Sequence, residues 1–203
     1  MNPSTEIYRL RELMPATGRM LVKISSQPQQ AKVLETPFPL PWKSGTRPIY
    51  INFDLWQRLS TPQRDLLLLR SVSWVLGIQW FKADWQRGVA LAGIVGSLFE
   101  LSQGDAVGVL VAGGLSAIAL RQIWRSNRSA KTEIDADEAA IKVAQRRGYS
   151  AVEAAEALLE TLESVAKLEG RSNLNFTELI RAQNLRAIAN LSPVGVPEQI
   201  RRN

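Results

Sequence analysis

The 203-residue sequence contains neither histidine nor cysteine. Without cysteine the chain can form no disulfide and no thiolate metal site, and it has no thiol nucleophile, which fits a reducing compartment. Without histidine it lacks the commonest metal ligand and the commonest general base of enzymes. The sequence therefore excludes a histidine-ligated zinc hydrolase and any catalysis that relies on cysteine or on a histidine base.

Charge and size set further bounds. The formal net charge of +6 favours acidic partners such as anionic lipid headgroups or nucleic acid. With 45% hydrophobic residues the chain can bury one good core, so we expect a single domain over residues 1–203. Residues 1–18 show the spacing of a short amphipathic helix and not the pattern of a signal peptide, so we expect them to be retained.

A small sheet is expected over residues 20–53. Strand-like segments at residues 20–24, 31–34 and 49–53 are separated by turn-forming residues and by a connector that repeated prolines keep extended. We expect residues 49–53 to form the edge strand of this sheet.

A long buried helix is expected over residues 60–81. Ser60 and Gln63 have the spacing of a capping box, which fixes the start of the helix. The segment that follows is apolar nearly all round, the pattern of a helix covered on all sides. Arg70 is the exception within it.

Two apolar stretches joined by a polar turn make up residues 86–124. The second stretch, residues 104–124, would span about 31 Å as a helix, enough for a hydrocarbon core of about 30 Å. Small residues recur at four-residue spacing on both stretches, as in membrane helix pairs. We expect a transmembrane helical hairpin; the alternative is a soluble hairpin packed on the core.

Basic residues follow the hairpin. By the positive-inside rule, they place both termini and the globular part on the cytoplasmic side of a membrane. Anionic lipid headgroups are the expected partner of this cluster, because the motifs of nucleic-acid-binding proteins are absent and no nucleic acid is expected. The cluster comprises Arg121, Arg125, Arg128 and Lys131.

Residues 132–190 are expected to be helical, with breaks after Gly148 and near Gly170 and a capping box that begins at Ser150. The first helix carries an acidic run that offers oxygen ligands for Mg²⁺ or Ca²⁺. Its charges spread around the helix, so we expect no metal and no cofactor there. The run comprises Glu133, Asp135, Asp137 and Glu138.

The order of these segments resembles that of zinc peptidases of the HtpX and CAAX-prenyl-protease type. Those enzymes place an HExxH helix after a short edge strand and take a third zinc ligand from a later Glu-x-x-Ala-Asp helix, often after a membrane hairpin. Here Arg70 and Ser71 stand at the positions of His-Glu, and Trp74 stands at that of the second histidine. Residues 133–137 match Glu-x-x-Ala-Asp. The resemblance implies an α+β, mostly α fold: a degenerate zincin-like metallopeptidase domain with a small N-terminal sheet and an inserted helical hairpin.

Other segments carry a closer resemblance. Residues 13–20, 38–42 and 62–70 are similar to a cyanobacterial family of unknown function, the domain of unknown function numbered 3318. This resemblance spans most of the chain, and it implies no known activity.

The zinc-peptidase resemblance groups five residues as a degenerate former active site: Arg70, Ser71, Trp74, Glu133 and Asp137. Only Glu133 remains of the ligand positions, and the general base is missing, so we expect no enzyme activity. We expect Arg70 to replace the zinc by pairing with Glu133, and with Asp137 or Asp135, while Trp74 fills the vacated volume. The alternative is that Arg70 extends to the surface and Glu133 stabilises a helix start.

The sequence thus favours a non-catalytic, membrane-associated pseudo-peptidase that serves as a binding or assembly scaffold for a protein partner. A cleft between the expected edge strand and the helix at residues 60–81 would accept an extended peptide by strand addition. No small-molecule substrate is indicated. One alternative is a soluble helical protein-interaction module, and another is an enzyme with an oxygen-ligated metal at Glu133.

Overall fold

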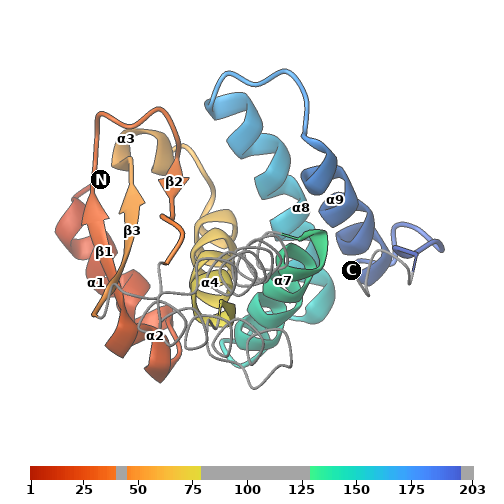
Figure 1. Cartoon of the computed structure of the whole chain (residues 1–203), viewed down its shortest axis with the longest axis horizontal. Helices are drawn as coiled ribbons and strands as arrows, with labels where there is room; N and C mark the ends of the chain where they lie inside the picture. Colours follow the sequence, from red (N-terminus) through yellow and green to blue (C-terminus); the bar gives the residue numbers. More distant parts are fainter. Residues whose placement is uncertain (40–44, 79–128, 198–203) are drawn as a thin grey trace, which may run out of the picture. The chain divides into compact units, whose positions relative to one another are not determined.

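A computed structural model of the chain describes residues 1–39, 45–78 and 129–197. The fold is α+β and mostly helical, with one small sheet, as the sequence predicts. Figure 1 shows the central helix α4 between the sheet on one side and α7, α8 and α9 on the other. The expected hairpin at 86–124 and the basic residues Arg121, Arg125 and Arg128 lie outside the described residues. Within those three ranges, no helix has the length and apolar character needed to cross a membrane.

The N-terminal segment forms two helices where the sequence suggests one over residues 1–18. Helix α1 spans Pro3–Leu13 and helix α2 spans Ala16–Leu21. The side chain of Asn2 caps α1 by accepting the N–H of Ser4 at 3.0 Å. Proline restricts the residue before it to extended conformations, so Met14 leaves the helix ahead of Pro15 and the chain turns there.

The sheet has three strands: β1 (Val22–Ser26), β2 (Leu34–Glu35) and β3 (Arg47–Ile51). Their order is β1-β3-β2, with β1 parallel and β2 antiparallel to β3. The prediction that residues 49–53 form the edge strand is therefore wrong, because β3 is central and β2 covers its second side.

Hydrogen bonds made by Asn52 explain why β2 lies at the edge of the sheet. Its side-chain amide donates to the carbonyl oxygens of Pro28 and Gln30 at 3.0 and 2.9 Å. Its backbone N–H donates to the carbonyl oxygen of Val33 at 3.0 Å. These bonds hold the segment that leads into β2 beside the end of β3, so β2 takes the edge position.

Helices α3 (Phe53–Trp56) and α4 (Thr61–Gly77) follow β3. The capping box of Ser60 and Gln63 is present, which confirms the predicted start of α4. Helix α4 is apolar nearly all round because it contributes to two cores. Leu68, Val72 and Val75 pack with the sheet and α1, whereas Leu66 and Leu69 pack with α7, α8 and α9.

The C-terminal helices are α7 (Ala130–Gln145), α8 (Ala151–Leu168) and α9 (Phe176–Ile188). Gly148 and Gly170 have positive φ angles of 98° and 71°, the conformation in which glycine ends helices, as predicted. The predicted capping box at Ser150 is present. A second capping box, in which Asn175 and Glu178 start α9, was not predicted.

A buried polar cluster joins α1 to α4. Glu6 accepts hydrogen bonds from Arg9 at 2.8 and 2.9 Å and from the indole of Trp56 at 3.2 Å. Arg9 also donates to Asp65 at 2.6 Å, and the hydroxyl of Tyr149 donates to Asp65 at 2.9 Å. Burial, followed by the bond to Asp65, raises the pKa of Tyr149 to about 12. These groups satisfy one another, so the cluster fastens α1 to α4.

Candidate functional site

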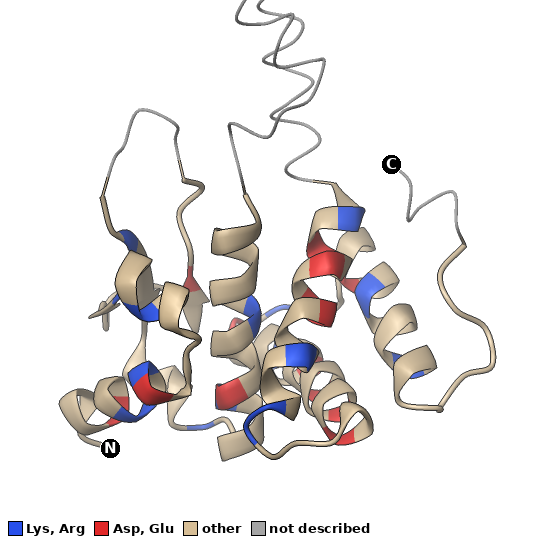
Figure 2. Ribbon diagram, turned by 90° about the horizontal axis from the view of Figure 1, so that it is seen from below, with Lys and Arg blue, Asp and Glu red and all other residues tan. Residues whose placement is uncertain are grey.

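A cleft of about 250 Å³ lies beside strand β2 and is bounded on its other sides by α4, α7, α8 and α9. Its apolar lining comes mainly from α4 and α8 and comprises Leu34, Leu67, Leu158, Leu162 and Val165. Its charged lining comprises Lys32, Arg70, Glu133, Glu169, Arg171, Glu178 and Arg181. The lining thus carries charges of both signs, and Figure 2 shows acidic and basic positions interspersed along the helices.

At the cleft, the side chain of Arg70 reaches from α4 to α7. Its guanidinium pairs with the carboxylate of Glu133, and its Nε lies 3.6 Å from Oδ1 of Asp137. The ion pair that the sequence predicts between Arg70 and Glu133 is therefore present. Burial of the guanidinium, followed by repulsion from Arg181, lowers the pKa of Arg70 to about 9. Arg70 thus stays protonated at neutral pH and keeps its charge for Glu133.

Asp137 has a stronger partner that sequence reasoning missed. Arg181 of α9 donates two hydrogen bonds to the Asp137 carboxylate, both at 2.8 Å. Asp137 is fully buried and Arg181 is 7% exposed, so each charge depends on the other at a position shielded from bulk solvent. The signal in the sequence is an arginine that follows Ile180 on the inner face of an amphipathic helix.

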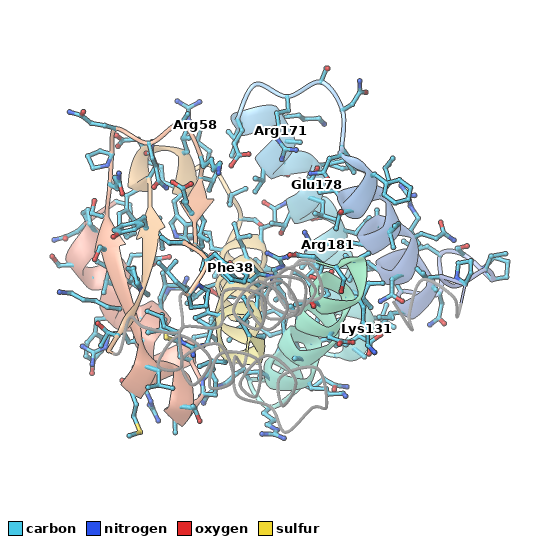
Figure 3. All side chains as sticks on the ribbon, in the orientation of Figure 1. Phe38, Arg58, Lys131, Arg171, Glu178 and Arg181 are labelled. Carbon is cyan, nitrogen blue, oxygen red and sulfur yellow. The ribbon has the colours of Figure 1, made fainter. Side chains whose placement is uncertain are left out.

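Arg171 and Glu169 form the opposite end of the cleft. Arg171 donates two hydrogen bonds to Glu178, at 2.8 and 3.0 Å, and its Nε lies 3.3 Å from Glu169. Glu169 in turn accepts the backbone N–H of Val33 at 3.1 Å. The C-terminal end of α8 is thereby tied to the start of β2. Figure 3 shows Arg171, Glu178 and Arg181 one below another beside α9.

Trp74 lies at the end of the cleft formed by the last turn of α4. Its ring meets that of Phe38 edge-on, with ring centres 6.0 Å apart. Its indole N–H has no acceptor among the described residues, and the hydroxyl of Thr36, which also lines the cleft, has no partner there either. Trp74 is expected to fill the vacated volume, but it lies against Phe38 with the cleft open beside it.

Ser71 is not arranged as a nucleophile. Its hydroxyl donates to the carbonyl oxygen of Leu67, one turn earlier in α4, at 2.8 Å. A serine that bonds the preceding turn of its own helix has its proton committed to the backbone. The remaining predicted residue, Lys131, is exposed in the first turn of α7 and lies outside the lining of the cleft.

The acidic run of α7 does not form a cluster of free oxygen ligands. Arginines hold the carboxylates of Glu133 and Asp137. Across the part of the chain that the structure describes, no group of three or more acidic side chains is placed to hold a metal ion. The cleft is thus a polar pocket crossed by ion pairs, and the indole N–H of Trp74 at its end has no acceptor within the described part of the chain.

The structure defines an α+β, mostly helical protein with a polar cleft at the edge of its sheet. The chain belongs to the family described as Protein of unknown function (DUF3318), whose profile matches residues 8–149. It is also similar to a thylakoid membrane protein of Synechocystis sp., with 28% identity over 151 residues that cover 72% of this chain and 69% of that protein. No solved structure matches the chain. The predicted resemblance to a cyanobacterial family is confirmed, and the resemblance to zinc peptidases receives no support from these matches.

Proposed function

We propose that this protein is a non-catalytic, membrane-associated scaffold that binds an extended segment of a protein partner in the cleft beside β2. The observation that carries the proposal is an open cleft between the edge strand of a sheet and a tryptophan whose N–H lacks an acceptor among the described residues. An edge strand binds peptides through its backbone, and a buried donor gains most from an acceptor supplied by a ligand.

The register of β2 supports strand addition at this edge. Backbone groups of successive residues in a strand point to opposite sides. The carbonyl oxygen of Val33 accepts the N–H of Asn52 and so faces β3, and Glu35, which pairs with Tyr50, faces β3 as well. The N–H of Val33 donates to Glu169 instead. Leu34 and Thr36, which line the cleft, then direct theirs away from β3. A partner segment would bond to these two residues.

The lining indicates what kind of segment fits. Lys32 and three arginines face three glutamates, so the charges nearly balance and favour a segment without a large net charge. Leu67, Leu158 and Leu162 provide an apolar surface for one aliphatic or aromatic side chain. We expect a peptide carbonyl to accept the N–H of Trp74.

Membrane association is supported by the name of the Synechocystis relative, a thylakoid membrane protein. We propose that residues 86–124 form a membrane hairpin and that both termini and the globular part lie on the cytoplasmic side. We also propose that Arg70, Ser71, Trp74 and Glu133 descend from a zinc-peptidase site. The packing of Arg70 against Glu133 supports that origin, because it brings together the two helices that would have held the metal.

Site-specific photocrosslinking tests the cleft. A photoreactive amino acid at Thr36 should capture a protein from detergent-solubilised membranes, whereas the same group at Gln29, in an exposed turn, should not. Trp74→Phe keeps an aromatic ring for Phe38 but removes the N–H together with one ring of the indole, and it should lower capture from Thr36. Equal capture from both positions, or capture that Trp74→Phe leaves unchanged, would contradict peptide binding in the cleft.

Carbonate extraction tests membrane insertion. Full-length protein expressed in its membrane should stay in the pellet at alkaline pH, because a hydrophobic hairpin is not released when peripheral proteins are. Release into the supernatant would favour the soluble interaction module instead. Both termini should also be accessible to protease added from the cytoplasmic side.

A further inference from the structure

Helix α2 and the start of β1 expose two large apolar side chains between two basic ones. Met20 is 77% and Leu21 40% exposed, and Arg19 and Lys23 on either side of them are exposed as well. We propose that these four residues, termed the α2 patch, rest on the headgroup region of an anionic lipid bilayer. This proposal rests on the membrane association proposed above, and it identifies the surface of the described unit that meets the lipid.

Three contacts show that α2 runs along α4 toward the C-terminal end of α4. Before α2 begins, Arg147 near the end of α7 donates to the carbonyl oxygens of Leu13 and Met14 at 3.2 and 3.0 Å. In the middle of α2, a Cβ on Gly18 would lie 2.9 Å from Cγ1 of Val72. Beyond α2, Val22 lies opposite Arg47 in the sheet, and Arg47 donates to the carbonyl oxygen of Val75. The α2 patch therefore lies beside the last turn of α4.

The described chain stops before the apolar segment, and resumes after it, at this same end of the unit. Arg70, in the second half of α4, pairs with Glu133 in the first turn of α7, while Leu66 and Ala144 pack in one core, so the two helices run antiparallel. The C-terminal end of α4 and the N-terminal end of α7 thus lie together. The chain leaves the described unit after Ile78 and returns at Ser129, and the sequence between them is the apolar one.

The chemistry of the α2 patch suits an anionic bilayer surface. Methionine and leucine side chains lower their free energy by leaving water for the acyl boundary. Arginine and lysine stems extend alongside them, and their charged groups reach the phosphates. Glu12 lies 3.6 Å from Arg19 and offsets part of this charge, so the patch stays positive through Lys23. A six-residue helix cannot anchor a protein by itself, and we assign the patch to orienting the unit on the membrane.

Tyr8 provides a matched control. It is 69% exposed and apolar, like Met20, but it precedes Arg9, which pairs with Asp65 in the second turn of α4. Tyr8 therefore belongs to the opposite end of α4. Because the chain has no cysteine, Met20→Cys and Tyr8→Cys each introduce a single site for a fluorescent label.

The experiment uses the full chain reconstituted into vesicles of phosphatidylcholine with or without phosphatidylglycerol. Nitroxide groups in the lipid headgroup region should quench a label at Met20→Cys more than one at Tyr8→Cys. Quenching at Met20→Cys should increase with phosphatidylglycerol and decrease in 1 M salt, where the screening length is about 3 Å. Arg19→Gln with Lys23→Gln should remove the dependence on phosphatidylglycerol.

Equal quenching of the two labels, in protein that still floats with the vesicles, would overturn the α2 patch proposal and leave membrane association standing. Quenching that does not respond to phosphatidylglycerol would overturn the role of the two basic residues. Failure of the protein to float with vesicles of either composition would overturn both membrane association and the patch.

Discussion

At the scale of single residues, Arg70 joins α4 to α7. Its partner Glu133 has a side chain that is only 20% exposed, and the second carboxylate, Asp137, is fully buried. Arg70→Met keeps most of the side-chain volume and removes the charge. We expect it to lower the free energy of unfolding by about 2–3 kcal/mol, because breaking a largely buried pair leaves an uncompensated carboxylate. Urea denaturation at pH 7 measures this.

The control for Arg70→Met is Lys32→Met. Lys32 pairs with Glu35 at 3.0 Å, but these side chains are 59% and 43% exposed. An exposed pair contributes less than about 1 kcal/mol, so Lys32→Met should be nearly neutral. Adding Glu133→Leu to Arg70→Met should restore part of the lost stability. If Arg70→Met and Lys32→Met were equally stable, the buried pair between Arg70 and Glu133 would contribute no more to stability than the exposed pair between Lys32 and Glu35.

Glu6 should make stability depend on pH in the acid range. Hydrogen bonds from Arg9 are the largest cause that lowers its pKa below the ordinary 4.5. A carboxyl with a lowered pKa in the folded state stabilises the fold above pH 4.5 and loses that contribution as pH falls further. Glu6→Gln should therefore be less stable than the wild type at pH 7, and this difference should shrink between pH 5 and pH 3.

Urea denaturation at pH 7, 5, 4 and 3 measures the effect of Glu6→Gln. Glu163→Gln, at an exposed position of α8, controls for the loss of one negative charge. A stability difference between wild type and Glu6→Gln that stays constant from pH 7 to pH 3 would contradict the lowered pKa.

At the scale of elements, α2 approaches α4 closely at Gly18. A Cβ added there would meet Cγ1 of Val72 at 2.9 Å, a separation that forces α2 to move. We expect Gly18→Ala to destabilise the protein by about 1–3 kcal/mol, the usual effect of overpacking a core. In the control Gly77→Ala the new Cβ meets no atom of the described residues within 4 Å. Because Gly77 ends α4, that change should be neutral or stabilising. Thermal unfolding of both variants measures the contrast, and equal behaviour would disprove the tight contact.

The sequence predicted those elements whose boundaries are set by local interactions. Ser60, Ser150, Gly148 and Gly170 start or end helices through groups a few residues away, so their patterns could be read directly. The order of the strands depends instead on distant contacts. The bonds of Asn52 to residues more than 20 positions earlier place β2 at the edge, and no local pattern indicates them.

In the cleft, too, some contacts could be predicted from the sequence and others depend on distant residues. The pairing of Arg70 with Glu133 could be predicted because the resemblance to zinc peptidases aligns their two helices. Arg181 lies 44 residues from Asp137, and its own helix gives no sign of which acid it meets. The cleft residues of α8, of α9 and of the loop between them, including Arg171 and Glu178, also lie beyond the segment that the family profile matches.

At the scale of the whole molecule, residues 1–78 and 130–203 form one compact unit and residues 79–129 a second. The first unit contains a large hydrophobic core on each side of α4. The polar cluster at Glu6 and the ion pairs at Asp137 lie within this unit. Its folding should not require the apolar segment.

A chain in which a short Gly/Ser linker replaces residues 79–128 tests this independence. Packed helices lie about 8–10 Å apart, and a linker of about six residues spans that distance between the adjoining ends of α4 and α7. We expect this variant to unfold cooperatively in urea and to leave the membrane pellet during carbonate extraction. Its cleft should still bind the partner, because every described lining residue is retained. An unfolded variant would show that the apolar segment completes the core, and a folded variant that remained in the pellet would place the membrane anchor in the first unit.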